Sequence, residues 1–144
     1  MYEPYTRQAL PTKRYRELLG TCLCVFNSNY SFIIENYLAT PGHPSYTWYA
    51  LIDLEAGKLK RRIDELSAQP LWSEISSLFS DLVTSRNRII HSSQITNKEN
   101  EQVLATKTRE KDGNQQFEIT EEYMLDFIRR NETLSSKLHQ LRGY

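Results

Sequence analysis

The stretch LWSEISSLFSDLVTSRNRIIHS, residues 71–92, decides the fold expected for this chain. Its apolar residues recur at steps of three and four, which is the spacing of one face of an α-helix. Pro70 suits the first turn of such a helix, where its missing N–H needs no partner. The stripe consists of Leu71, Ile75, Leu78, Leu82, Arg86 and Ile89. We therefore predict a helix over 71–92 that buries one face and carries Arg86 on that face.

Three further segments show the same period. A helix is predicted from about 13 to 40, with Thr12 as its N-cap, and a second from about 45 to 66, after a Pro-Gly-His-Pro turn. The second stripe carries one charged residue, Glu55. A last helix is predicted after Thr120, because acidic residues follow that cap and favour the positive end of the helix dipole.

The period changes between the third and last helices. Residues 93–101 are mostly polar and are predicted to be a loop. Residues 103–108 and 116–119 are predicted to be two short strands, because an Asp-Gly pair between them is typical of a hairpin. The pattern predicts an all-α fold: a four-to-five-helix bundle in one domain, 1–144, with a small β-hairpin insert at about 102–119.

Composition narrows the functional classes. The chain has 18 basic and 18 acidic residues, so any contact with nucleic acid must be local. Cys22 and Cys24 are two apart in a predicted helix and diverge, which predicts core filling in a reduced compartment, without a disulfide or zinc site. Neither a signal peptide nor a membrane-spanning stretch is visible, which predicts a cytoplasmic protein that makes no membrane contact.

Arg86, Asn87 and His91 are the candidate catalytic residues. Histidine, with a pKa near neutrality, can take a proton from an RNA 2′-hydroxyl or give one to the leaving oxygen. Arginine can pair with the negative charge that develops on phosphate, and Asn87 can orient either group. Positions 86 and 91 lie about 140° apart on an ideal helix, so they converge only if the helix ends near His91 or a second copy faces it.

This segment, Arg86-Asn87-Arg88-Ile89-Ile90-His91, resembles the R-x4-6-H motif of the HEPN superfamily. The resemblance covers the motif and the helix layout. It implies a homodimer that cleaves RNA without a metal or other cofactor, as a toxin or phage-defence component. It also implies an antitoxin or nucleotidyltransferase-like partner. Roles carried over from the family are phosphate binding for Arg86, a helper role for Asn87 and acid or base catalysis for His91.

Other interpretations of these residues remain open. Arg86 at a core edge can be structural, with Glu55 as its predicted ion-pair partner. The basic residues Lys58, Arg61, Arg62 and Arg88 are candidate RNA contacts, although such clusters more often form a solvated face. The chain is alternatively a non-catalytic HEPN-like module that binds a protein or nucleotide, or an unrelated bundle in which the motif arose by chance.

Overall fold

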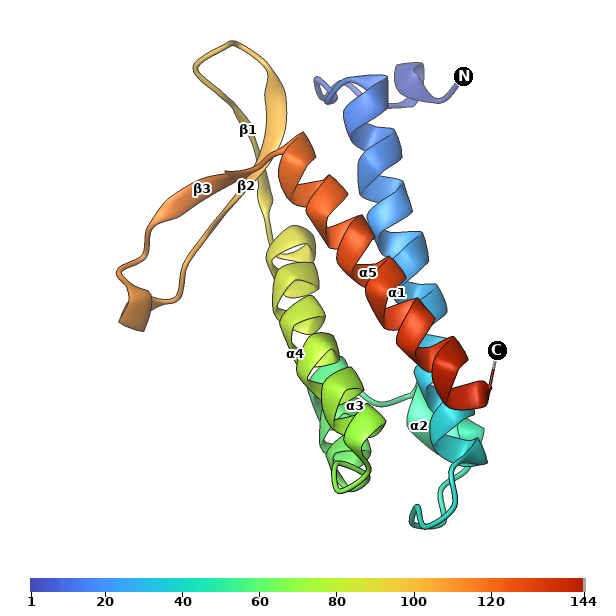
Figure 1. Ribbon diagram of the computed structural model, residues 1–144. Helices are drawn as coiled ribbons and strands as arrows, with labels where there is room; N and C mark the ends of the chain where they lie inside the picture. Colours follow the sequence, from blue (N-terminus) through green and yellow to red (C-terminus); the bar gives the residue numbers. More distant parts are fainter. Residues whose placement is uncertain (144) are drawn as a thin grey trace.

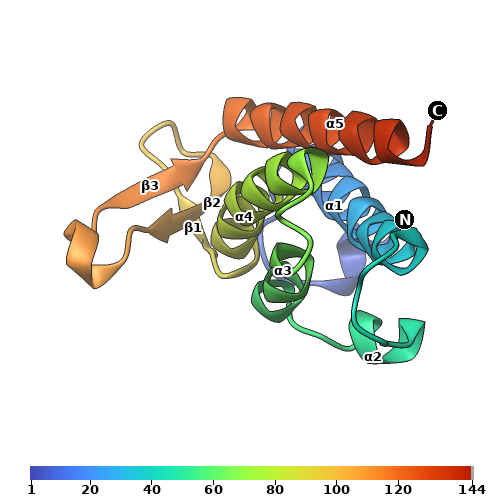
Figure 2. The same ribbon diagram turned by 60° about the horizontal axis from the view of Figure 1, so that its bottom comes forward.

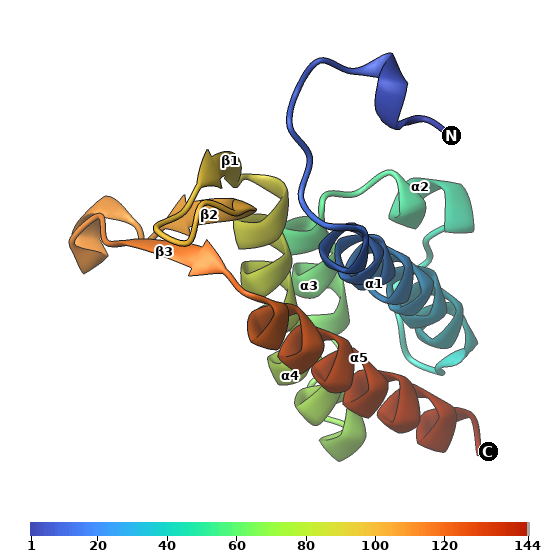
Figure 3. The same ribbon diagram turned by 90° about the horizontal axis from the view of Figure 1, so that it is seen from above.

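Three long helices form the core of the protein, in a computed structural model that describes residues 1–143 (Figure 1). They are α1 (Lys13–Ala39), α4 (Pro70–Ile90) and α5 (Glu121–Arg142). Helices α1 and α5 lie side by side and run in the same direction, while α4 packs against α5 in the opposite direction (Figures 1 and 3). No helix among the described residues is long and apolar enough to cross a membrane.

The ends of α1 and α5 lie where their sequence signals predict. The Thr12 hydroxyl accepts a hydrogen bond from the Tyr15 N–H at 3.2 Å, and Thr120 accepts from the Tyr123 N–H at 3.0 Å. Gly143 ends α5 with a φ of 84°, a left-handed conformation that glycine adopts without strain. Both predicted N-caps are confirmed, and each such cap stabilises its helix by about 1 kcal/mol.

The single helix predicted over 45–66 is wrong. The chain forms two short helices there, α2 (Trp48–Ile52) and α3 (Ala56–Asp64). The Tyr30 hydroxyl donates a hydrogen bond to the Leu54 carbonyl at the break, so a tertiary contact satisfies a backbone group that a continuous helix would have used. The break allows α3 to lie along α4, while α2 packs against α1 (Figure 2).

The all-α prediction is also wrong, because the chain contains a three-stranded antiparallel sheet in the order β1-β2-β3. Its strands are β1 (Ser93–Thr96), β2 (Gln102–Lys107) and β3 (Gln116–Ile119). The predicted pairing of β2 with β3 is confirmed. Strand β1 lies where a loop is predicted, so that prediction is wrong. All four of its residues are exposed. Because the strand buries no face, its sequence lacks the alternation of apolar and polar residues that indicates a strand.

The core is centred on the ring of Phe26 in α1. Its centroid lies 6.0 Å from that of Phe79 in α4 and 6.2 Å from that of Phe127 in α5. A buried polar contact adds a second link between α1 and α5, because the Asn29 amide donates to the Asn131 carbonyl at 2.8 Å. These contacts join the three long helices through one aromatic cluster.

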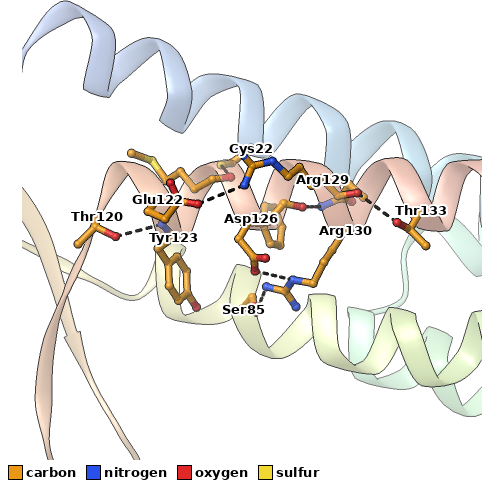
Figure 4. A network of polar contacts seen from close by, with 12 residues as sticks. Cys22, Ser85, Thr120, Glu122, Tyr123, Asp126, Arg129, Arg130 and Thr133 are labelled. Atoms are coloured by element: carbon orange, nitrogen blue, oxygen red, sulfur yellow. Dashed lines mark hydrogen bonds and ion pairs between the residues drawn. The ribbon is translucent and has the colours of Figure 1, made fainter.

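A polar contact links α4 to α5 at the edge of this core. Arg130 pairs with Asp126 at 2.9 Å and also donates to the Ser85 hydroxyl at 2.9 Å (Figure 4). Ser85 directly precedes Arg86, so this contact helps to hold the last turns of α4 in place against α5.

Tyr15 joins the sheet to the helices. Its hydroxyl donates to the carbonyl of Ile119 in β3 at 2.5 Å and accepts from the N–H of Leu104 in β2 at 3.0 Å. The side chain is buried, with 4% of its surface exposed. One residue of α1 therefore holds two strands that come about a hundred residues later in the chain.

We expect Tyr15→Phe to lower the free energy of unfolding by about 1–3 kcal/mol, because a buried carbonyl and a partly buried N–H each lose a partner. Urea unfolding followed by circular dichroism measures the change. The matched control is Tyr49→Phe on α2, where the ring is 79% exposed and no change is expected. Equal stability of the two variants would contradict the role assigned to Tyr15.

The two cysteines lie in different surroundings. Cys22 is buried, with its thiol 3.6 Å from the Met124 carbonyl, and Cys24 is exposed. The core-filling prediction is therefore confirmed for Cys22 and wrong for Cys24. Burial raises the pKa of the Cys22 thiol to about 11, so the reactive thiolate is scarce at neutral pH.

A thiol reagent should therefore label Cys24 alone in the native protein at neutral pH. Both cysteines should react in denaturant, because unfolding removes the burial that suppresses the Cys22 thiolate. Mass spectrometry of iodoacetamide-treated protein locates the label. Cys24→Ser should abolish native labelling, and native labelling at Cys22 would contradict the burial described here.

Candidate functional site

The final turn of α4 carries the predicted motif. The helix ends at Ile90, and His91 is its C-cap with φ −100° and ψ 16°. The His91 backbone N–H donates to the Asn87 carbonyl at 3.0 Å, while the imidazole is exposed. Figure 1 shows that this end of α4 leads directly into β1, beside β2. His91 therefore lies between the helical core and the sheet.

Arg86 lies against the core, with its guanidinium carbon 4.8 Å from the centre of the Phe26 ring. Its Nε donates a hydrogen bond to the Asn87 side-chain oxygen at 3.2 Å. Burial lowers the pKa of Arg86, and the nearby Tyr30 hydroxyl opposes that shift. Among residues 1–143, no carboxylate lies within ion-pair distance of Arg86. A half-buried cation without an acidic partner is costly to a fold.

Arg86 lines a hollow of about 430 Å³ between α1, the junction of α2 with α3, and α4, which we call the arginine hollow. It is lined by Asn27, Tyr30, Ile52, Leu54, Glu55, Ala56 and Arg86. Glu55 is exposed and precedes α3 as its N-cap residue. Glu55 and Arg86 both line this hollow. Among the described residues they do not form the ion pair that the sequence predicts.

His91 lines a second hollow of about 330 Å³, which we call the histidine hollow. Its lining residues are Thr84, Asn87, Arg88, His91, Thr106, Lys107 and Arg109. Residues 84–91 come from the end of α4, and residues 106–109 come from the end of β2 and the turn after it. Strand β2, which the sequence predicts, therefore supplies one wall of the site together with the turn after it.

Within one chain, Arg86 and His91 line different hollows. Asn87 connects them, because its side chain accepts from Arg86 and also lines the histidine hollow. Neither of these two hollows is lined by both Arg86 and His91. Seen from above in Figure 3, α4 lies between the sheet and α3. The residues that line the histidine hollow come from α4 and β2 with the turn after it, and those that line the arginine hollow include residues of α4 and α3.

The other predicted RNA contacts are dispersed. Arg88 lines the histidine hollow, with its guanidinium carbon 5.6 Å from the centre of the Phe117 ring. Lys58 and Arg61 are exposed on α3 and line neither hollow. Arg62 is paired with Glu65 at 3.3 Å. The predicted cluster on α3 is thus separate from the motif.

Sequence reasoning missed Lys107 and Arg109, which line the histidine hollow together with His91. A basic pair at the end of a polar strand was visible in the sequence, but its proximity to residue 91 depends on the sheet. No group of three His, Cys, Asp or Glu side chains placed to hold a metal ion occurs in the part of the chain that the structure describes.

Comparison with known proteins gives no match: no protein-family model, curated protein or solved structure matches this chain. The interpretation of the site therefore depends on the motif and on the chemistry of the two hollows.

We expect Arg86→Met to change the free energy of unfolding by no more than about 1 kcal/mol. The variant loses one hydrogen bond and a ring contact, but it also removes a half-buried charge that has no acidic partner. Urea unfolding measures the difference. A loss of about 3 kcal/mol or more would show that the Arg86 charge is a structural requirement.

Proposed function

We propose that this domain is a metal-independent endoribonuclease of the HEPN type, acting as a cytoplasmic homodimer in a toxin or phage-defence role. The observation that carries the proposal is Arg86, a half-buried cation without an ion-pair partner among residues 1–143, hydrogen-bonded to Asn87 and close in sequence to the exposed His91. Residues that lower stability in this way are commonly retained for function.

The chemistry follows from the groups present. His91 takes the proton from a 2′-hydroxyl, whose oxygen attacks the adjacent phosphorus as the bond from phosphorus to the 5′-oxygen breaks. A second acid, His91 of the partner copy or water, protonates the leaving oxygen. Arg86 stabilises the negative charge on the non-bridging oxygens, and Asn87 orients the guanidinium. The products carry a 2′,3′-cyclic phosphate and a 5′-hydroxyl.

A dimer contact along the end of α4 would complete this site. Ile90 is 45% exposed there, an apolar side chain that an identical copy can cover. Such a contact would bring Arg86 of one copy toward His91 of the other, which one chain alone does not achieve. The antitoxin or nucleotidyltransferase-like partner implied by the resemblance remains part of this proposal.

The test is cleavage of a labelled RNA in the presence of a chelator. We expect His91→Ala to lower the rate about 100- to 10,000-fold, the range for loss of an acid–base group. Mass spectrometry of the products should find cyclic phosphate ends. His139→Ala, on an exposed part of α5, is the matched control and should retain activity.

Equal activity of the wild type and His91→Ala, or no cleavage by either, would refute the catalytic proposal. The separation of Arg86 from His91 within one chain favours a second candidate, the non-catalytic module that binds a protein or nucleotide. That function predicts a stable complex that survives His91→Ala, and a protein that only cleaves RNA would exclude it.

A further inference from the structure

The histidine hollow has an unusual balance of charge for this chain. Its lining contains Arg88, Lys107, Arg109 and the titratable His91, and no acidic residue. The arginine hollow and three further hollows on the protein are each lined by at least one Asp or Glu. In a protein with zero net charge, this hollow beside the motif therefore has a cationic lining.

Contacts with neighbouring residues position the three permanent cations of this hollow, but acidic groups neutralise their charge only weakly. Arg88 lies over the Phe117 ring, and the Lys107 ammonium donates to the Asn114 side-chain oxygen. Arg109 pairs with Asp112 at 3.4 Å, but the two side chains are 72% and 46% exposed. An exposed pair of this kind contributes little to stability, so an anion can displace Asp112 at little cost.

Two elements that are distant in the sequence form this hollow. Thr106, which lines it, pairs across the sheet with Phe117, the residue that supports Arg88. The β2–β3 segment, residues 102–119, is therefore part of the site, because it brings Lys107 and Arg109 to the end of α4.

We infer that the β2–β3 segment is an RNA-binding arm, and that the histidine hollow binds backbone phosphates of single-stranded RNA between Arg88, Lys107 and Arg109. This inference rests on the proposed ribonuclease function and assigns its substrate site. Asn87 and His91 line the same hollow, so a phosphate bound there lies beside the acid–base group. A single strand suits the site because its flexible backbone can enter a small hollow and align a 2′-oxygen for attack, whereas a duplex is rigid.

The test measures binding of fluorescently labelled 2′-O-methyl RNA, whose blocked 2′-oxygen cannot attack, so cleavage does not interfere. We expect the double variant Lys107→Gln and Arg109→Gln to weaken binding about tenfold or more at moderate salt. Loss of two phosphate contacts should also reduce the slope of log affinity against log salt concentration by about 1.4.

The matched control is Lys13→Gln with Lys98→Gln, which removes the same charge from exposed positions outside the hollow and outside residues 102–119. It should bind within about twofold of the wild type, because only contacting cations contribute to the salt slope. The charge-preserving double variant Lys107→Arg and Arg109→Lys should also retain binding. Circular dichroism checks that all three variants are folded.

Equal losses of affinity in the hollow and control variants would overturn the inference, as would an unchanged salt slope in the hollow variant. Cleavage of unmodified RNA is scored separately. Binding that depends on Lys107 and Arg109 without His91-dependent cleavage would support the arm and refute the nuclease. His91-dependent cleavage with unchanged binding in the hollow variant would refute the arm alone.

Discussion

The packing of Phe26 among the three long helices is the contact on which the rest of the structure depends. Its ring meets Phe79 of α4 and Phe127 of α5, so one side chain sets the spacing of all three helices. The same ring lies under the guanidinium of Arg86. The aromatic core therefore does two things at once: it holds the bundle together and it supports the arginine at the edge of the candidate site.

The site follows from the position of α4 between two neighbours. One face of its last turns meets α1 and α3, where Arg86 lies, and another faces the sheet, where His91 and Arg88 lie. Asn87 is the residue common to both faces. The zero net charge of the chain is compatible with an anionic substrate, because acidic residues line the other described hollows and leave this one cationic.

Sequence reasoning succeeded where the signal is local. Thr12 and Thr120 mark helix starts through contacts within one turn, and apolar periodicity marks the long helices. It failed where the structure depends on distant contacts. The apolar residues keep their helical spacing across the break before α3, so the sequence does not reveal the break. A hydrogen bond from the Tyr30 hydroxyl to the Leu54 carbonyl accompanies it. Strand β1 has no buried residue, so only its backbone pairing with β2 reveals it.

The sequence by itself determined the three long helices, the β2–β3 pairing and the placement of Arg86, Asn87 and His91 at a helix end, because these depend on spacing along a few turns of chain. Only the tertiary structure decided that Arg86 and His91 open on different hollows, and that Lys107 and Arg109 join His91. The physical reason is that Arg86 and His91, five residues apart, point to different sides of the helix end, and the packing of the sheet and of α3 decides what each of them meets there.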